Sequence, residues 1–407
     1  MSTLDTSSLS QEIAEARWYG GKGEEIAGVE EEDRLDLEDG CALHILRIRT
    51  GSGAEDRYLY LTGEERLGAP LMRALAEGRR VQGRVAEFVF EPGAALRGLL
   101  PRSVGQRPMG LDQSNTSLVV DERLVIKLYR RLEAGDHPEI ELGRFLTDTA
   151  HIAFMPAYVG SVRWGDYAIA MVQAYVSNAR DGWSWATDTV VSGETAPFAL
   201  LGKQTAALHG ALAQVASRTA TMVELRGWRQ GAERQLDRAL QLVGGDTGRE
   251  LAQMAPAIRL EFEAFEQLAQ TPILTRVHGD YHVGQIVRFA DGLRVVDFEG
   301  EPTKPMAERV ALGTPLRDVA AMLRSFDHLA RYVDRDVIPG DPVRIERWLT
   351  EARGAFLGGY GDHDPQLLRA LEVEKETYEF IYAATFLPEW MYVAIGGMRW
   401  LMRGRAG

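Results

Sequence analysis

The residues best suited to chemistry lie between 277 and 301, on either side of a tight turn. Asp280 and Gln285 stand before the turn, in the run His-Gly-Asp-Tyr-His-Val-Gly-Gln, and Asp297 follows it. An Asp-Gly pair at 291–292 between two short apolar runs is typical of a β-hairpin. Because a hairpin folds the chain back on itself, we expect the three oxygen-bearing side chains to converge on one cleft.

These three groups suit phosphoryl transfer. The reaction needs a carboxylate that orients an attacking hydroxyl group and accepts its proton, and it needs hard oxygen ligands for the magnesium ions that bridge nucleotide phosphates. We therefore assign Asp280 as the base, and Gln285 and Asp297 as metal ligands. The alternative is a structural hairpin whose carboxylates are merely solvated.

The spaced pattern of this stretch resembles the aminoglycoside phosphotransferase-like branch of the protein-kinase fold, with its loop His-Gly-Asp-x-His-x-x-Asn/Gln and a metal-binding Asp after a hairpin. The wider run, from Gln285 through 296–302 to 308–309, is similar to the bacterial maltokinases. The resemblance implies a bilobal, kinase-like α/β fold that uses ATP and Mg²⁺. The candidate substrate contacts in this stretch are His278, His282 and Glu299.

A lysine inside an apolar strand is the next candidate. Lys127 stands in Leu-Val-Ile-Lys-Leu-Tyr at 124–129, where an ammonium group is costly without an anionic partner. The alternative is an edge strand whose lysine points to water. In the kinase-like folds that the chain resembles, this lysine touches the α- and β-phosphates and pairs with a helix glutamate.

The partner of Lys127 should lie on a helix predicted to start at Pro138. Glu141 matches the maltokinase-like pattern Pro-x-x-Glu-x-Gly-Arg-Phe-Leu, so we expect it to make the pair, with Glu139 as the fallback. Both acids stand in the first turn, where they could instead interact only with the helix dipole.

A polar run precedes the lysine strand. Its hydroxyl and amide groups can donate hydrogen bonds to phosphate oxygens, in place of the glycines of other nucleotide loops. The candidates are Gln113, Ser114, Asn115, Thr116 and Ser117. Polar turns are common, so this assignment gains its weight from Lys127.

Strand-like runs at 152–156, 158–164 and 167–173 close the small lobe, and 178–182 is the expected hinge. In this fold adenine bonds to backbone groups of the hinge, so the side chains there are weakly informative. Gln173 and Tyr175 are candidates by position alone.

The first 105 residues carry strand-like runs but no kinase chemistry. The runs are 42–49, 57–61 and 85–90, and 67–77 has the spacing of a helix. The segment 17–23 is not a phosphate loop, because its lysine is not followed by Ser or Thr. We expect a tight turn with an anchoring aromatic pair there, as at the start of the maltokinase cap that it resembles. Whether Lys22 faces the cleft stays open.

The amino-acid composition argues against some classes of binding partner. A net charge of -13 argues against nucleic acid, and no apolar run approaches the ~20 residues of a membrane helix. The polar residues 1–10 do not predict a signal peptide, and the single cysteine, Cys41, fits a reducing compartment. We expect a cytoplasmic monomer or weak dimer of 407 residues, with no nucleic-acid or membrane partner.

From Trp183 onward the pattern is helical. Asp318 stands in the first turn of a predicted helix at 316–326. The resemblance implies that it accepts backbone hydrogen bonds from the catalytic loop, and a plain helix-start acid is the alternative. We expect His209 to be a packed or cap-bonded histidine within a helix at 199–212.

The segment at 379–390, near the C-terminus, is expected to determine which acceptor the protein binds. Aromatic rings beside carboxylates suit a sugar, because the rings pack on its C–H face while the acids bind its hydroxyl groups. The candidate contacts are Glu379, Tyr382, Glu389 and Trp390, although Trp390 could be an ordinary packed residue. Maltokinases carry arginines where this chain has 383–387. Carboxylates without arginine would also suit a protonated amino group.

We therefore predict three parts: a β-rich cap at 1–105, a small nucleotide-binding lobe at 106–176, and a helical lobe at 177–407 with the catalytic loop and the sugar site. The predicted function is a maltokinase-like sugar kinase that makes maltose 1-phosphate from maltose and ATP. The first alternative is an amino-sugar kinase such as glucosamine kinase. An antibiotic phosphotransferase and a nucleotide-binding pseudokinase are the others.

Overall fold

The protein forms two compact units, Met1–Asn178 and Ala179–Gly407, each mixing helices with strands in line with the predicted α/β class. The structure, a computed structural model, describes residues 6–99, 105–110, 115–290, 292–301 and 304–403. The predicted division at 176/177 lies close to the boundary between the units, whereas the predicted division at 105/106 falls inside the first unit.

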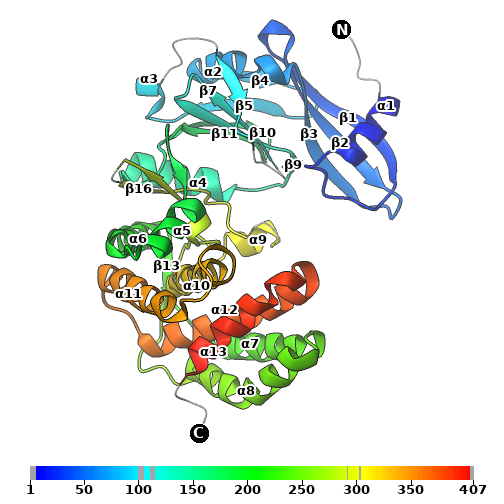
Figure 1. The fold of residues 1–407 in the computed structure, drawn as a ribbon. Coiled ribbons are helices and arrows are strands. Elements are labelled where there is room, and N and C mark those ends of the chain that lie inside the picture. The colour runs from blue at the N-terminus through cyan, green and yellow to red at the C-terminus, as the bar shows by residue number, and fades with distance from the viewer. Residues whose placement is uncertain (1–5, 100–104, 111–114, 291, 302–303, 404–407) are drawn as a thin grey trace. The chain divides into compact units, whose positions relative to one another are not determined.

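Seven antiparallel strands form the main sheet of the first unit, in the order β4-β5-β10-β11-β8-β7-β6 (Figure 1). They are β4 (Arg80–Gln82), β5 (Glu87–Pro92), β6 (Gln106–Pro108), β7 (Asn115–Val120), β8 (Leu124–Tyr129), β10 (Tyr158–Trp164) and β11 (Tyr167–Ala174). The sheet therefore contains β4 and β5 from the predicted cap together with the strands of the predicted small lobe. Because β8 lies between β11 and β7, Lys127 is on an interior strand and not on an edge.

A second, four-stranded antiparallel sheet has the order β1-β2-β3-β9. Its strands are β1 (Ile26–Asp36), β2 (Ala42–Thr50), β3 (Glu55–Thr62) and β9 (Arg131–Leu132). The helices of this unit are α1 (Thr6–Glu15), α2 (Gly68–Ala76), α3 (Leu96–Leu99) and α4 (Pro138–Arg144). The predicted aromatic anchor is present: Tyr19 is buried, its ring centroid lies 5.5 Å from that of Tyr58, and Trp18 packs on the same ring.

Asp33 joins the two sheets of this unit. Its buried carboxylate accepts a hydrogen bond from Trp164 Nε1 at 2.8 Å and others from the backbone amides of 84–86. Burial alone would raise the pKa of Asp33, but these hydrogen bonds lower it below its usual value. The ionised carboxylate thus links β1 to β10, which belong to different sheets.

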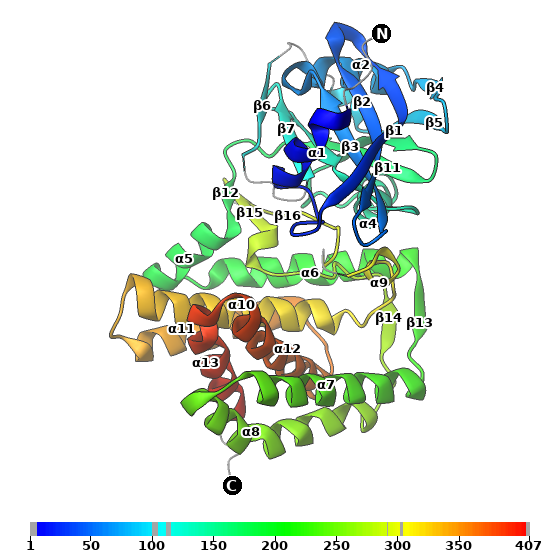
Figure 2. The same ribbon diagram turned by 90° about the vertical axis from the view of Figure 1, so that its right-hand side faces the viewer.

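The second unit is mainly helical. Its helices are α5 (Gly182–Ser192), α6 (Ala196–Val215), α7 (Met222–Leu242), α8 (Gly245–Glu263), α9 (Met306–Arg309), α10 (Leu316–Tyr332), α11 (Pro342–Tyr360), α12 (Pro365–Phe386) and α13 (Met391–Met402). Figures 1 and 2 show α7 and α8 lying side by side. Phe198, Phe326, Trp348 and Phe356 pack edge to face where α6, α10 and α11 meet, which fixes the helices beneath the catalytic loop.

The predicted catalytic hairpin is present. β15 (Ile286–Phe289) and β16 (Gly292–Val295) pair from Ile286 opposite Val295 to Phe289 opposite Gly292, and Asp291 lies outside the described residues. β12 (Arg180–Asp181) adds a third strand, and β13 (Ser217–Thr219) pairs separately with β14 (Ile273–Thr275).

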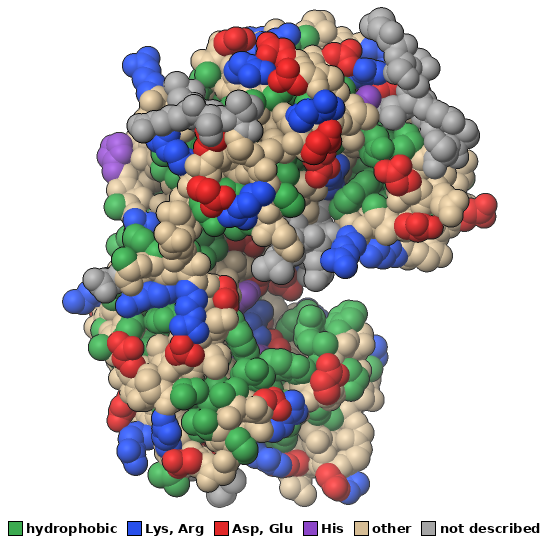
Figure 3. Space-filling view, turned by 45° about the horizontal axis from the view of Figure 1, so that its top comes forward, with side chains coloured by type: hydrophobic (Ala, Val, Ile, Leu, Met, Phe, Trp, Pro, Cys, Tyr) green, Lys and Arg blue, Asp and Glu red, His purple; other side chains and the backbone are tan. Residues whose placement is uncertain are grey.

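Positively and negatively charged side chains are interspersed on the surface. Lys and Arg side chains lie among Asp and Glu side chains on both units in Figure 3. Within the described parts of the chain, none of the helices combines the length and the apolar character that a membrane span needs.

Candidate active site

One buried carboxylate accepts hydrogen bonds from the backbone of the catalytic loop. Asp318, in the first turn of α10, accepts hydrogen bonds from the backbone amides of His278 at 2.8 Å and Gly279 at 3.0 Å. It also binds His209 Nε2 at 3.1 Å, while His209 Nδ1 lies 3.1 Å from the Tyr360 hydroxyl. Burial would raise the pKa of Asp318, yet the bond from His209 and the backbone bonds lower it. This is the loop-holding role predicted for Asp318.

His209 is a residue whose part in the site the sequence did not reveal. A packed histidine was predicted, and the ring is buried, but its packing partner is the carboxylate that shapes the catalytic loop. No local sequence pattern could indicate the contact between His209 and Asp318, because 109 residues separate them along the chain.

His278 holds two parts of the site together. Its side chain is buried, its Nε2–H donates to the carbonyl of Val296 at 3.0 Å, and its Nδ1 accepts from the amide of Asp280 at 3.4 Å. Both ring nitrogens are therefore occupied. The ring ties the catalytic loop to the end of the hairpin, and a substrate contact by His278 stays a prediction.

The hairpin brings the two predicted metal ligands together. Gln285 Nε2 lies 3.3 Å from Asp297 Oδ2, and the amide of Val296 donates to the carbonyl of Gln285 at 2.9 Å. Asp297 has a φ of 65°, a strained backbone conformation that aims its side chain where an extended residue could not. An amide oxygen and a carboxylate are the hard oxygen donors that Mg²⁺ accepts, so this pair fits the ion.

Asp280 is a carboxylate kept ionised by its neighbours. Burial would raise its pKa, but His282, whose Nε2 lies 3.7 Å from Asp280 Oδ2, lowers the pKa to about 2 with help from His278 and Lys375. The Nδ1 of His282 accepts from the amide of Gly284 at 3.0 Å, which leaves the Nε2 side for Asp280.

In the first unit, Lys127 forms its ion pair with Glu139, at 3.0 Å, and Tyr129 donates to the same carboxylate at 2.9 Å. The prediction that Glu141 is the partner was wrong, and the fallback was right. At about 100° per residue, the two acids of α4 face nearly opposite directions, so only one can face β8. Glu139 is the buried one, whereas Glu141 is half-buried.

The polar run is mostly strand and not turn. Gln113 and Ser114 lie outside the described residues, and β7 begins at Asn115. The hydroxyl oxygen of Thr116 accepts a hydrogen bond from Arg130 Nε at 2.8 Å, so it is engaged within the first unit. Ser117 is buried directly opposite Lys127 in the strand pair, so it shares the face of the lysine.

The two hinge candidates are engaged in the sheet. Gln173 pairs with Tyr158 on one side and Val125 on the other. The amide of Tyr175 donates to the carbonyl of Arg123 at 2.7 Å, so that amide cannot bind adenine. A nucleotide contact by either residue stays a prediction.

A cavity of about 460 Å³ in the second unit, named here the Glu379 cavity, adjoins the catalytic loop. Its polar and aromatic lining residues are Trp183, His282, Arg324, Ser325, His328, Glu379, Tyr382 and Trp390. Four of the seven predicted substrate contacts are thus together. The parallel rings of Trp390 and Tyr332 lie 6.2 Å apart, so Trp390 is both packed and exposed to the cavity.

Arg324, His328 and Trp183 were missed, because each stands in an ordinary helical pattern. Glu379 forms an ion pair with Arg324. Burial would raise the pKa of Glu379, but Arg324 and other cations lower it, so the carboxylate is ionised. Burial lowers the pKa of His328 to about 3, so this ring is neutral, and its Nε2 makes no hydrogen bond within the described residues.

Glu389 does not join the other candidates. Its side chain is exposed and is not part of the lining of the Glu379 cavity, and its carbonyl accepts from Arg335 at 3.1 Å. Glu389 lies in the short helical turn Pro388–Trp390, and a sugar contact by its side chain stays a prediction. Glu299 is buried and lines neither cavity of this unit described here.

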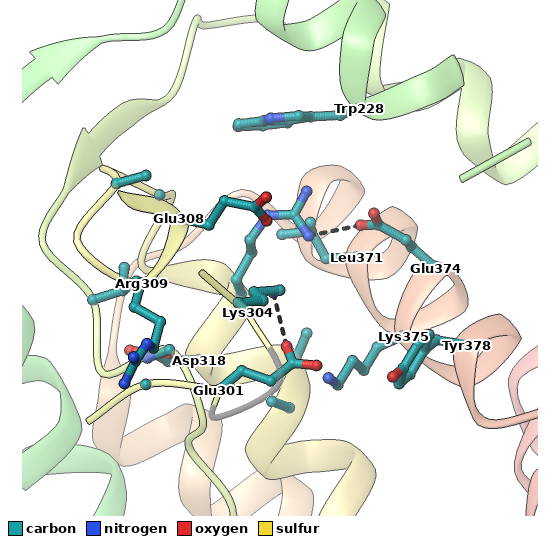
Figure 4. A pocket seen from close by; sticks show the side chains of 18 of the residues that line it. Trp228, Glu301, Lys304, Glu308, Arg309, Asp318, Leu371, Glu374, Lys375 and Tyr378 are labelled. Atoms are coloured by element: carbon teal, nitrogen blue, oxygen red, sulfur yellow. Dashed lines mark hydrogen bonds and ion pairs between the residues drawn. The ribbon is translucent and has the colours of Figure 1, made fainter. Parts of the chain in front are cut away.

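A second cavity of about 300 Å³, named here the Lys375 cavity, has Gly279 of the catalytic loop in its lining. Figure 4 shows its labelled charged and aromatic side chains. Its charged and aromatic lining residues are Trp228, Glu301, Lys304, Glu308, Arg309, Arg317, Asp318, Glu374, Lys375 and Tyr378. No motif or spacing in the sequence indicated this second cavity.

Known proteins resemble the chain in both sequence and fold. The Phosphotransferase enzyme family (APH) matches residues 105–371. The chain is 33% identical to the glucosamine kinase of Streptacidiphilus jiangxiensis over 395 residues, with 88% of each chain covered. It is 32% identical to the glucosamine kinase of Mycolicibacterium smegmatis, with 71% of this chain and 77% of the relative covered. A solved glucosamine kinase in complex with glucosamine, ADP and inorganic phosphate is similar over 97% of this chain and 99% of its own, with 27% identity and a TM-score of 0.78.

Proposed function

Because this chain belongs to the phosphotransferase enzyme family, we propose that it transfers the γ-phosphoryl group of ATP to a hydroxyl group of an amino sugar, with glucosamine as the first candidate acceptor. The observation that carries the proposal is the Glu379 cavity, where an ionised carboxylate and aromatic rings stand beside the loop of Asp280. The relatives are named glucosamine kinases, so they favour this alternative over maltose.

The chemistry rests on Asp280. An ionised carboxylate accepts a hydrogen bond from the sugar hydroxyl and so aims its oxygen at the γ-phosphorus. As the new oxygen–phosphorus bond forms and the bond to ADP breaks, the hydroxyl proton passes to the carboxylate. His282 holds Asp280 in the ionised form that this role requires.

Each unit, taken by itself, offers groups that suit a nucleotide. Lys127, steadied by Glu139, supplies a cation for the phosphates of ATP. Gln285 and Asp297 would hold Mg²⁺, which when bound neutralises phosphate charge. The Lys127–Glu139 ion pair orders its side chains within the first unit, and the Gln285–Asp297 hydrogen bond does so within the second.

The acceptor assignment follows from charge. Glu379 offers a carboxylate to the ammonium group of an amino sugar, and the rings of Tyr382 and Trp390 offer apolar faces to the sugar C–H groups. A neutral sugar is the second candidate, because the ion pair with Arg324 already neutralises part of the charge of Glu379.

Release of ADP from ATP tests the proposal with glucosamine, glucose, maltose and an aminoglycoside as acceptors, and NMR of the product locates the phosphate. We expect glucosamine to give the highest kcat/KM, and the Glu379→Gln variant to lose at least about tenfold on glucosamine but less on glucose. Equal losses on both sugars would show that Glu379 does not bind the amino group. No ADP release with any acceptor would overturn the proposed function.

A further inference from the structure

Helix α12 contributes side chains to both cavities beside the catalytic loop. Lys375 and Tyr378 line the Lys375 cavity, whereas Glu379 and Tyr382, one turn further on, line the Glu379 cavity. One cavity reaches Gly279 and the other reaches His282. The base at Asp280 therefore stands between a cavity with a lysine and a cavity with a glutamate.

Lys375 differs from the neighbouring cations of its cavity. Lys304 lies 2.7 Å from Glu301, and Arg317 lies 2.9 Å from Glu374. No carboxylate of a described residue is within ion-pair distance of Lys375 Nζ, which lies 5.3 Å from the centroid of the Tyr378 ring. Figure 4 shows the side chain extending from α12 into the cavity toward Glu301.

The ammonium group of Lys375 is surrounded by charged groups that do not contact it directly. Burial lowers its pKa, as does Arg324, while Glu379, Glu301 and Asp280 act in the opposite direction. Three carboxylates thus influence the ammonium group from beyond direct contact. A shielded ammonium group with no direct anionic partner is costly, and clefts are where such groups bind ligands.

We propose that Lys375 is an acceptor-binding residue: its ammonium group donates a hydrogen bond to a sugar oxygen next to the hydroxyl that Asp280 orients, and its charge excludes a second amino group from this position. The inference rests on the proposed function and deepens it. The substrate class is then a sugar with a single amino group, placed toward Glu379, and not an aminoglycoside with several ammonium groups.

The proposal predicts opposite effects on two ligands. Loss of a charged hydrogen bond should weaken glucosamine binding about ten- to hundredfold in Lys375→Met. Removal of the repulsion should strengthen binding of kanamycin, a polyamine, by about threefold or more. Lys375→Arg keeps the charge, so it should still exclude kanamycin and recover part of the glucosamine affinity. A purely structural residue would weaken both ligands together.

Calorimetric titration of the full chain in the presence of ADP tests this without turnover. The control is Lys203→Met, which removes an exposed lysine of α6 and should bind both ligands like the wild type. Thermal unfolding checks that the variants fold, and Lys375→Gln replaces the Met variant if that variant does not fold. Unchanged glucosamine affinity in Lys375→Met, or weaker kanamycin binding, would overturn the proposal.

The same titration separates the two proposals. If the wild type binds glucose or maltose and not glucosamine, the amino-sugar function fails. The role of Lys375 is then decided by whether the Met variant loses affinity for the sugar that binds. Absence of binding by every sugar overturns both proposals.

Discussion

The ammonium group of Lys127 lies 3.0 Å from the carboxylate of Glu139, on an interior strand facing a helix of the same unit. Only 14% of the lysine side chain and 3% of the glutamate side chain are exposed. Neither group can exchange its partner for water. A cation held in this way is positioned before a nucleotide arrives, and removal of either charge leaves the other one buried without the opposite charge of this pair.

Glu139→Gln should therefore damage both stability and nucleotide binding. We expect the free energy of unfolding to fall by about 3 kcal/mol and the KM for ATP to rise about tenfold, because Lys127 loses its charged anchor. Glu141→Gln is the matched control, two residues along the same helix, and should change either quantity little. Chemical unfolding and steady-state kinetics measure the effects. A larger effect of Glu141→Gln on ATP would restore the original assignment.

The fold and most of the catalytic stretch could be predicted because their signals are local. The hairpin at Asp291-Gly292, the loop around Asp280 and the interior lysine each occupy a few consecutive residues, so turn chemistry and strand pattern were enough. β1 was missed because its run of acids hides the apolar alternation of an 11-residue strand. Its alternation is weak because much of the strand remains partly solvent-accessible.

Contacts between distant segments could not be predicted. The choice between Glu139 and Glu141 depended on which side of α4 faces β8, and the two acids are equivalent by composition. His278 was a candidate substrate contact because histidine often binds ligands, yet both of its ring nitrogens bond to backbone groups. The helical pattern around Lys375 is ordinary, so its position in the lining of a cavity beside Gly279 could be seen only in the structure.

Asp318→Asn should loosen the catalytic loop. The amide side chain has one acceptor oxygen, so it cannot accept from His278, Gly279 and His209 as the carboxylate does. We expect kcat to fall at least about tenfold and the free energy of unfolding at pH 7 to fall by about 2–3 kcal/mol.

The pH dependence gives a separate check on Asp318. Its pKa is lowered in the folded protein, so its contribution is present above the usual value of 3.8 and is lost as pH falls through the folded pKa. The difference in stability between wild type and Asp318→Asn should therefore shrink below about pH 4, as unfolding in urea at several pH values would measure. A difference that grew toward acid would contradict this account.

Asp280 should titrate far below neutrality. Because His282 and other neighbours hold its pKa at about 2, kcat/KM between pH 5 and 8 should show no ionisation of this carboxyl group. Asp280→Asn should lower kcat by about 10²–10⁴-fold and leave ATP affinity unchanged. His282→Gln should raise the pKa of Asp280 toward 3.8, as carbon-13 NMR of labelled aspartate would show. A wild-type carboxyl signal that titrates above pH 4 and is absent from Asp280→Asn would refute the assignment.

A cluster of acids behind the Glu379 cavity predicts an effect on stability alone. Glu376 is buried beside Asp327, which pairs with Arg331 at 2.8 Å, and Glu376 Oε1 makes no hydrogen bond within the described residues. Burial and the nearby Asp327 and Glu379 raise the pKa of Glu376 well above 4.5. The folded protein therefore retains a proton that the unfolded chain gives up. Stability from this group is full below pH 4.5 and is lost as pH rises through the folded pKa.

Glu376→Gln should remove that loss, since the amide stays neutral at every pH. We expect unfolding in urea at pH 8 to show a variant more stable than the wild type by at least about 1 kcal/mol, and a smaller difference at pH 4.5. Gly397→Ala is the complementary test, because a Cβ at Gly397 would lie 2.6 Å from Glu376 Oε1, and this variant should lose about 1–3 kcal/mol. A Glu376→Gln variant less stable at pH 8 than the wild type would mean that the carboxylate is ionised and paired in the folded protein.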